Sequence, residues 1–394
     1  IAYDKKCEKR LFVSPAGGVV REIRRGLKRR LMSVVIDLLD EEEMVSFEPL
    51  NLYKATRDEI VERLLEGGIF PHIKQRPFDL LADPLSIPRD IFVKAVETAP
   101  FVPSGEMQVE GWEEDFQTGL TTLKRLTEGL VHLVYKEGST CEAFTKAQDV
   151  DRHTVDGPHP AANPSLHIQK IHPIRKNDEV VWTIDVVGVI AIGHLINQGR
   201  YFTPRVLSIA GSGVIEGRRE YIKGRAGFPV SALIDGRIPK GSIRCISGDP
   251  LTGTQVETEG FMGFYETAFS VIPENTDQEM FHFFRPGISK YTASRTYVTG
   301  HLKGYKYPFS TNQHGERRPF ITSSPYDKVM PLHINTMLLV KSVMAEDFDL
   351  AESLGILEVA PEDFALPAFV DPSKIDMMDI MREGLAAYAE ELLE

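Results

Sequence analysis

The stretch that most constrains the fold of this 394-residue chain is the apolar run at residues 180–196, VVWTIDVVGVIAIGHLI. It contains Asp185 and His194, and it is shorter than the ~20 apolar residues that a helix needs to cross a bilayer. We interpret it as a buried strand followed at once by a buried helix, which is typical of an α/β protein. Such a unit needs further strands and helices on both sides of it.

The residues before this run supply them. Residues 56–68 (TRDEIVERLLEGG) begin with Thr and Asp, place apolar residues at helical spacing and end in two glycines, which predicts a helix. Further on, helix-like and strand-like segments alternate, namely IFVKAVETA, GLTTLKRLTEG and GLVHLVYKEG. We therefore predict an α/β unit over residues 46–204.

The two ends of the chain and its middle have different patterns. Residues 1–45 contain three short strand-like runs broken by glycine-containing turns. Three strands bury too little to be stable alone, so we expect the N-terminal strands of this unit to be missing and no earlier strand to be available for pairing. Residues 205–324 are rich in strand patterns, with a short helix around FPVSALIDG, and residues 325–394 return to helical patterns.

Composition and charge exclude one class of function. The formal net charge is -12, whereas a general nucleic-acid binder must neutralise phosphates with clustered basic residues. One local basic turn does occur near the N-terminus, and we predict that it contacts a partner: Arg24, Arg25, Lys28, Arg29 and Arg30. A merely solvated charge run is an equally good interpretation. Lys28 does not have the Met-Lys-Met setting of a biotinyl or lipoyl carrier.

No segment offers a strong cofactor or metal motif. Cys7, Cys141 and Cys245 are far apart and form no CxxC pair, which argues against a disulfide framework or a thiolate metal site. Residues 206–217 (VLSIAGSGVIEG) follow a strand with glycines, but no amphipathic helix comes next, so we predict a strand and turn rather than a dinucleotide site. GxSxG, HExxH and GxxxxGK[ST] do not occur.

Four histidines gather in a proline-rich stretch. Metal ligation on a helix needs a rigid spacing, and the prolines of this stretch predict that no helix forms there. We therefore predict a polar loop and no metal site for His153, His159, His167 and His172.

Several segments together resemble one known family, and they occur in the same order: SPAGGVVREIRRGLKRRLMSVVI, EGGIFPHIKQRPFD, IFVKAVETAPFVPSG, GPHPAANPSLHI, the run at 180–196, SIRCISGDPLTG and YDKVMPLHINTMLLVKSVMAEDF. The family is NqrA, one of the subunits of the Na+-translocating NADH:quinone oxidoreductase, which is similar in plan to RnfC and to the NADH- and FMN-binding subunit of respiratory complex I. The resemblance implies a multidomain α/β and β fold. Its parts would be a partial barrel-sandwich hybrid (1–45), a Rossmann-like α/β domain (46–204), a β-rich region with a ubiquitin-like β-grasp domain (205–324) and a C-terminal helical domain (325–394).

The resemblance also implies that this chain lacks two features of its nucleotide-binding relatives. Nucleotide-binding relatives carry a glycine-rich loop after the first helix and cysteines for an iron–sulfur cluster in the helical region. Here only two glycines precede IFPHIKQRPFD, and residues 366–372 (LPAFVDP) contain no cysteine. The loop resembles a former nucleotide loop that is now filled by Phe70, Pro71 and Phe78, with Arg76 as a polar handle. We predict no catalytic, cofactor-binding or metal-binding residue, and we regard Phe70, Arg76 and Phe78 as candidates to lie near quinone.

The implied role is that of a cofactor-free peripheral subunit on the cytoplasmic side of the bacterial inner membrane. It would dock on the membrane subunit NqrB and contribute to the region where ubiquinone or menaquinone is reduced. NADH, FAD, FMN and the iron–sulfur centre would belong to other subunits, and the chain alone would have no catalytic activity. Two alternatives remain: an NADH- or FMN-binding oxidoreductase subunit related to RnfC, and an isolated ligand-binding protein that uses the β-grasp domain.

Overall fold

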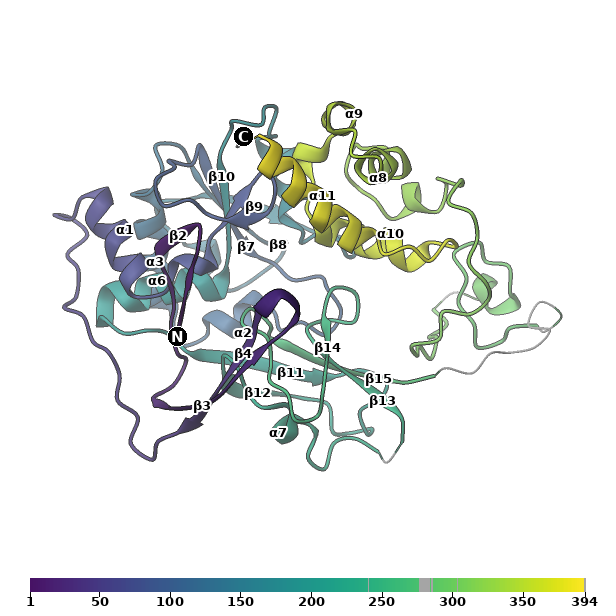
Figure 1. The fold of residues 1–394 in the computed structure, drawn as a ribbon, viewed down its shortest axis with the longest axis horizontal. Helices are drawn as coiled ribbons and strands as arrows, with labels where there is room; N and C mark the ends of the chain where they lie inside the picture. The colour runs from purple at the N-terminus through teal and green to yellow at the C-terminus, as the bar shows by residue number, and fades with distance from the viewer. Residues whose placement is uncertain (240, 276–283, 285, 303, 393–394) are drawn as a thin grey trace.

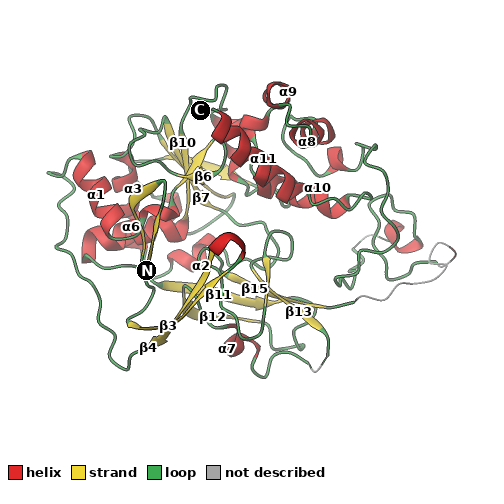
Figure 2. Ribbon diagram, viewed as in Figure 1, coloured by secondary structure: helices red, strands yellow, loops and turns green. Residues whose placement is uncertain are grey.

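The structure is a computed structural model that describes residues 1–239, 241–275, 284, 286–302 and 304–392, with only the backbone described at Lys28. Figure 1 shows an α/β unit at the upper left, a β unit below it and the C-terminal helices, in yellow, at the upper right. Figure 2 shows most of the helices in two groups on either side of the upper sheet. None of the described helices is long and apolar enough to span a membrane.

The α/β unit is built on a six-stranded sheet with the order β6-β5-β10-β7-β8-β9. The strands β10, β7, β8 and β9 are parallel, and β5 and β6 extend the sheet in antiparallel fashion. Their bounds are β5 (Lys74–Arg76), β6 (Leu80–Leu81), β7 (Asp90–Ala95), β8 (Val131–Lys136), β9 (Asp151–Val155) and β10 (Val181–Asp185).

The two faces of this sheet belong to different cores. Trp182 of β10 packs into the core formed with α1 (Arg57–Glu66), α3 (Glu113–Lys124) and α6 (Val186–Gln198). Its neighbour Val181 faces the opposite way, into a core shared with the C-terminal helices. This alternation follows from the two-residue period of a strand. Both faces are covered, as a parallel sheet requires.

The run at residues 180–196 is confirmed as β10 followed directly by α6. Gly199 ends α6 in a left-handed conformation (φ 64°), which glycine adopts without steric cost. The helices α3 and α6 pack closely, because a Cβ atom at Gly193 would lie 1.7 Å from the carbonyl oxygen of Asp115. Shorter helices complete the unit: α2 (Gly105–Val109), α4 (Glu142–Thr145) and α5 (Pro164–Ile171).

The prediction that the proline-rich histidine stretch forms no helix is wrong. His167 lies inside α5, and His153 lies on β9. Pro164 occupies the first turn of α5, where a missing N–H group leaves no hydrogen bond unmade, so this proline starts the helix instead of breaking it.

The β unit contains a five-stranded sheet with the order β12-β11-β15-β13-β14, in which β11 and β15 are parallel. The bounds are β11 (Pro204–Ala210), β12 (Glu220–Arg225), α7 (Val230–Ile234), β13 (Ile243–Ser247), β14 (Thr254–Val256) and β15 (Ala268–Pro273). The glycines after β11 lead into the antiparallel strand β12, so the prediction of a strand and turn there is confirmed.

The N-terminal residues form two hairpins: β1 (Ala2–Asp4) with β2 (Cys7–Phe12), and β3 (Gly18–Arg25) with β4 (Leu31–Leu38). The expectation that no earlier strand is available for pairing is wrong, because β1 pairs with β2. Three residues are too few to give a detectable alternation, which is why the pattern missed β1. A 3-10 turn, η1 (Leu27–Arg29), joins β3 to β4.

The C-terminal part is helical, as predicted. Its helices are α8 (Thr336–Met344), α9 (Phe348–Ser353), α10 (Ala365–Val370) and α11 (Met377–Glu391), and its 3-10 turns are η5 (Tyr326–Lys328), η6 (Ile356–Glu358) and η7 (Pro361–Phe364). The largest of these, α8 and α11, pack through Leu339, Val343, Met381 and Leu385 against the second face of the α/β sheet. A further 3-10 turn, η4 (Val298–His301), precedes this part.

Candidate functional site

The α/β sheet has a crevice where its strand order reverses. From β7 the chain proceeds to β8 and β9 on one side, and it then crosses back to β10 on the other side. In open α/β sheets, ligands bind outside the carboxyl ends of the strands at such a point. A cavity of about 290 Å³ lies there, closed on its far side by residues 249–268 of the β unit. We call it the switch-point crevice.

Carboxylates outnumber cations among the described residues that line the switch-point crevice. The acidic residues are Asp79, Glu97, Asp185, Asp249, Glu266 and Glu362, and the basic residues are Lys74, Arg76 and Lys94. All three cations already lie within ion-pair distance of a carboxylate: Lys94 Nζ is 2.9 Å from Glu97 Oε2, Lys74 Nζ is 3.3 Å from Asp79 Oδ2, and the Arg76 guanidinium is 3.9 Å from Asp79 Oδ1. An anionic ligand would therefore meet an excess of negative charge.

The helix α6 begins at the crevice, and its N-terminus is capped by a side chain of the protein itself. The N-terminus of α6 has free N–H groups and a positive dipole end, which is where a phosphate binds in many α/β folds. Here Asp185 Oδ1 accepts a hydrogen bond from the backbone N–H of Gly188 at 2.7 Å. The protein's own carboxylate thus caps this helix and adds a negative charge where a phosphate would have to approach.

The loop after α1 is filled, as the sequence predicted for Phe70 and Pro71. Both residues lie in η2 (Phe70–His72) and are buried. The Phe70 ring packs edge-on against Trp182, with centroids 5.8 Å apart. The Pro71 carbonyl oxygen accepts a hydrogen bond from the Tyr265 hydroxyl at 2.7 Å, which ties this loop to the β unit.

Phe78 does not lie in the filled loop with Phe70 and Pro71. It is only half-buried, and its ring packs edge-on against Tyr388 of α11, with centroids 5.5 Å apart. It therefore belongs to the second core, on the opposite side of the sheet from Phe70. The expectation that Phe70, Pro71 and Phe78 fill one loop together needs this correction: the short strand β5 separates Phe78 from the other two residues.

Arg76 is buried, with only 2% of its surface exposed, and lines the switch-point crevice. Its guanidinium donates a hydrogen bond to Ser165 Oγ and lies 3.9 Å from Asp79 Oδ1. Its charge also acts on the buried Asp363: burial raises the pKa of that carboxyl to about 6, and Arg76 opposes the rise. The Nε atom of Arg76 has no hydrogen-bond partner among the described residues.

Glu266 is the crevice carboxyl that can exchange a proton near neutral pH. Burial, and then the charge of Asp249, raise its pKa to about 7. A carboxyl with such a pKa can donate or accept a proton under physiological conditions. The pKa of Lys94 moves the other way from what burial alone would cause, because Glu97 and Glu362 raise it above its ordinary value.

We expect Glu266→Gln to remove a pH-dependent component of stability. A carboxyl whose pKa is raised on folding stabilises the fold below its unfolded pKa of 4.5, and this contribution is lost as the pH rises through about 7. The variant should therefore match the wild type at pH 4 and exceed it by about 1–3 kcal/mol at pH 8. Denaturant unfolding at both pH values measures this, with the exposed Glu259→Gln as the control; equal pH profiles for all three proteins would contradict the assignment.

The basic turn lies at the tip of the β3–β4 hairpin. Arg25, Arg29 and Arg30 are exposed, whereas Arg24 is half-buried and lies 2.9 Å from Glu22. The side chain of Lys28 lies outside the described part of the structure. Apolar side chains are exposed beside the turn, with exposed fractions of 51% for Ile23, 93% for Leu27 and 65% for Met32.

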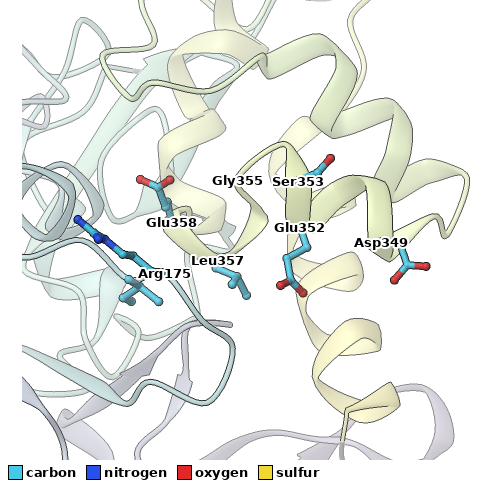
Figure 3. Close-up of a pocket in the computed structure, with 8 residues that line it drawn as sticks. Arg175, Asp349, Glu352, Ser353, Gly355, Leu357 and Glu358 are labelled. Atoms are coloured by element: carbon cyan, nitrogen blue, oxygen red, sulfur yellow. The ribbon is translucent and has the colours of Figure 1, made fainter.

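A second, more open pocket of about 540 Å³ lies between residues 174–175 and the α9–η6 segment. Figure 3 shows Arg175, Glu352 and Glu358 around it. Its carboxylates are engaged in holding the helices, since Glu352 accepts a hydrogen bond from Tyr388 and Glu358 accepts one from Gln169 at 2.6 Å. It therefore has less to offer a ligand than the switch-point crevice.

Sequence patterns did not identify most of the crevice. Lys94 and Glu97 lie in one segment and Glu266 lies in another, distant one, and these residues match no motif. Asp185 did give a signal, because a charged residue between a buried strand and a buried helix is a helix-capping position.

Comparison with known proteins settles the family. Three family models match in chain order: the NqrA N-terminal barrel-sandwich hybrid domain at residues 1–39, the NqrA second alpha/beta domain at 55–201 and the NQRA C-terminal domain at 206–258. The NqrA protein of the Na(+)-translocating NADH-quinone reductase of Chlamydia caviae is 39% identical over 391 residues, which cover 96% of this chain and 83% of that protein. This chain belongs to the NqrA family of Na(+)-translocating NADH-quinone reductase subunits.

Other members of the NqrA family are similar to this chain over almost its whole length. The protein of Chlamydia pneumoniae is 38% identical over 96% of this chain and 83% of its own length, and that of Yersinia pseudotuberculosis is 34% identical over 98% and 87%. The resemblance found in the sequence is thus confirmed. Among solved structures, an NAD+-reducing [NiFe]-hydrogenase chain aligns with 55% of this chain and 47% of its own at 13% identity and a TM-score of 0.39, a likeness too distant to argue from.

Proposed function

We propose that this chain is a peripheral subunit of a Na+-transporting NADH:quinone oxidoreductase and binds no nucleotide or flavin itself. Membership of the NqrA family supports the proposal that this chain is a subunit of the complex. The switch-point crevice supports the proposal that it binds no nucleotide or flavin. The observation that carries it is the Asp185 carboxylate on the N-terminus of α6, in a crevice where carboxylates outnumber cations. NADH, FAD, FMN and the iron–sulfur centre would then be bound by other subunits of the complex.

The isolated chain is therefore expected to be colourless. An absorption spectrum of the purified protein should lack the flavin and iron–sulfur bands, and added FMN or NADH should not protect it against thermal unfolding, because a ligand that binds the native state raises its stability. A flavin band near stoichiometric occupancy, or a clear stabilisation by NADH, would instead favour the alternative of a nucleotide-binding subunit related to RnfC.

The strand orders of the two sheets support the assignment of a Rossmann-like domain and a β-grasp domain. In the α/β unit the parallel strands run β9-β8-β7-β10, which is the 3-2-1-4 order of half a Rossmann fold. The β unit has its strands in the order 2-1-5-3-4 with the first and last parallel, which is the β-grasp arrangement. We assign residues 46–204 and 205–324 to these two domains, flanked by the barrel-sandwich part (1–45) and the helical domain (325–394).

We further propose that the β3–β4 hairpin docks on the membrane subunit NqrB, at the cytoplasmic side of the bacterial inner membrane. The hairpin combines exposed apolar side chains with a tip of arginines, in a chain of net charge -12. Apolar groups exposed together are typical of a protein interface, and basic residues are attracted to anionic lipid headgroups or to acidic groups of a partner. The two features occur together on this hairpin.

Reversing the charge of this turn is expected to weaken assembly. The triple change Arg25→Glu, Lys28→Glu and Arg29→Glu replaces attraction with repulsion, and each basic residue near an anionic surface contributes ~1 kcal/mol. The amount of this protein that co-purifies with the membrane complex measures the effect. The matched control reverses Arg218, Arg219 and Lys223, which are exposed on the β unit. Equal co-purification of both variants would show that the turn is only solvated surface.

We propose that this chain contributes to quinone reduction through the switch-point crevice. Of the three candidates near quinone, Arg76 lines this crevice, whereas Phe70 and Phe78 pack into the two cores. A quinone is an uncharged ring with two carbonyl oxygens, so it can accept a hydrogen bond from a guanidinium without the charge repulsion that a phosphate would meet.

A further inference from the structure

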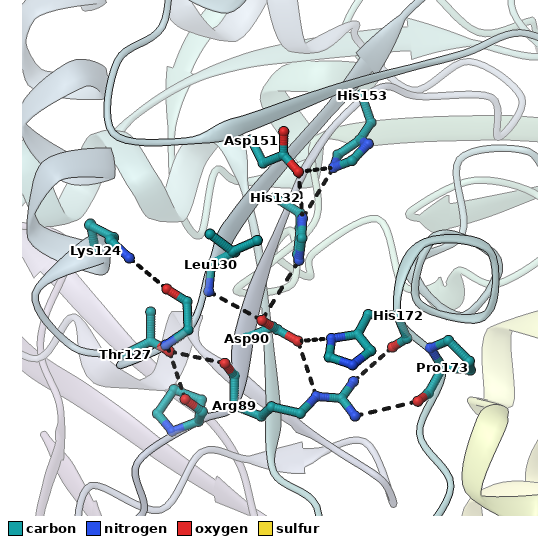
Figure 4. A network of polar contacts seen from close by, with 12 residues as sticks. Arg89, Asp90, Lys124, Thr127, Leu130, His132, Asp151, His153, His172 and Pro173 are labelled. Atoms are coloured by element: carbon teal, nitrogen blue, oxygen red, sulfur yellow. Dashed lines mark hydrogen bonds and ion pairs between the residues drawn. The ribbon is translucent and has the colours of Figure 1, made fainter.

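Two histidines and an aspartate meet on neighbouring strands at one edge of the α/β sheet. The register of β8 and β9 sets His132 opposite Asp151, and it sets Val134 opposite His153. Asp151 and His153 are two residues apart on β9 and therefore point to the same face of the sheet. His132 reaches this face from β8, so its ring lies beside both side chains of β9, as Figure 4 shows.

The ligand atoms of these residues have the spacing of a tetrahedral metal site. His132 Nδ1 lies 3.1 Å from His153 Nε2 and 3.8 Å from Asp151 Oδ2, and His153 Nε2 lies 3.4 Å from Asp151 Oδ2. Zinc binds imidazole nitrogen and carboxylate oxygen at about 2.0–2.2 Å, which puts two ligands of a tetrahedron about 3.3–3.5 Å apart. All three distances are within ~0.3 Å of that range, so the three atoms are close enough to bind a single ion.

A carboxylate lies behind His132, on the side of the ring away from Asp151 and His153. Its Nε2 atom is buried, has no hydrogen-bond partner among the described residues and faces Asp90 Oδ1 at 3.8 Å. Asp90 is itself held in place by His172 Nδ1 at 2.7 Å and by the backbone N–H of Leu130 at 3.1 Å. A carboxylate behind a histidine fixes the protonated nitrogen and makes the other nitrogen a better ligand.

The remaining coordination position faces water. His132 is buried, but the side chain of His153 is 26% exposed and that of Asp151 is 53% exposed. An ion held by these three residues would therefore keep a water molecule as its fourth ligand. It would also join the edge strand β9 to β8, beyond the hydrogen bonds of the ladder.

We propose that His132, His153 and Asp151 form a binding site for Zn²⁺, with Asp90 orienting His132 from behind. The donor set of two imidazoles and one carboxylate suits this ion, whereas Mg²⁺ and Ca²⁺ prefer oxygen ligands alone. The site lies on the outer strands of the sheet. It is a property of this chain and does not depend on the function proposed for the switch-point crevice.

Zinc binding to the full chain tests this proposal. The protein is stripped with a chelator and titrated with ZnCl2 by isothermal calorimetry, and a second titration with CoCl2 reports the geometry through its visible absorption. We expect one equivalent of metal, a cobalt spectrum of a tetrahedral site without thiolate bands, and an increase in melting temperature on addition of zinc.

Matched variants locate the ion. His153→Ala and Asp151→Ala change residues that are at least partly exposed, so both proteins should fold, and each should bind zinc at least ~10-fold more weakly. His301→Ala removes an exposed histidine elsewhere and should bind like the wild type. A wild-type protein that binds no zinc, or variants at residues 151 and 153 that bind it as tightly as the wild type does, would overturn the proposal and leave a hydrogen bond between the two histidines.

Discussion

Replacing Phe70 by alanine is expected to lower the free energy of unfolding by about 3–5 kcal/mol, the usual cost of truncating an aromatic side chain in a well-packed core. None of the Phe70 surface is exposed, and its ring packs against the equally buried Trp182 of β10. The cavity left behind would lie between the loop after α1 and the centre of the sheet. Chemical denaturation of the isolated chain measures the loss.

The exposed aromatic residue Tyr53 provides the control for this experiment. It is 96% exposed, so Tyr53→Ala should change the stability by less than about 0.5 kcal/mol. If Phe70→Ala is as stable as Tyr53→Ala, the loop is not a packed plug, and the account of it as a filled former nucleotide loop fails.

The second large effect is expected at Arg76. Arg76→Met keeps the length of the side chain but removes the charge that acts on the buried Asp363 and the hydrogen bond to Ser165. Removing one partner of a buried charge pair typically costs about 3–5 kcal/mol, because the other charge stays buried without compensation. The free energy of unfolding at pH 7.5 should fall by this order of magnitude.

The same variant has a defined pH dependence. Burial already raises the pKa of Asp363 to about 6 from 3.8, and loss of Arg76 raises it further. Protonation then removes the buried charge, so the difference from the wild type should be small near pH 4 and grow as the pH rises through 6. Adding Asp363→Asn should recover part of the lost stability. A loss that does not vary with pH would show that Arg76 stabilises the fold through packing and its hydrogen bond to Ser165, and not through the charge of Asp363.

A functional role for Arg76 needs a different measurement. Arg76→Lys keeps the positive charge but loses the fork of donors, so the fold should suffer less than in Arg76→Met. In the assembled complex, a residue that contacts quinone should raise the apparent KM for quinone when replaced by lysine, with NADH oxidation by artificial acceptors unchanged. An unchanged KM would leave Arg76 with its structural role only.

Local patterns predicted those parts of the fold that local interactions decide. The start of α1 is one example: Thr56 accepts a hydrogen bond from the backbone of Glu59, and the Glu59 carboxylate accepts one from Thr56, all within four residues. The β10–α6 unit is another, because its apolar residues are contiguous. Local patterns failed at β1, which is too short to show a period, and at α5, whose first-turn proline was taken as a helix breaker.

Residue order and apolar content were enough to predict the family, the succession of the α/β, β and helical regions and the burial of Phe70 and Pro71. Which distant residues meet depends on the three-dimensional fold. His132 and His153 are 21 residues apart, and the parallel register of β8 and β9 sets them side by side. Arg76 is enclosed because α5 supplies Ser165 and η7 supplies Asp363. Strand register and the pairing of buried charges are long-range properties, and no local pattern in the chain encodes them.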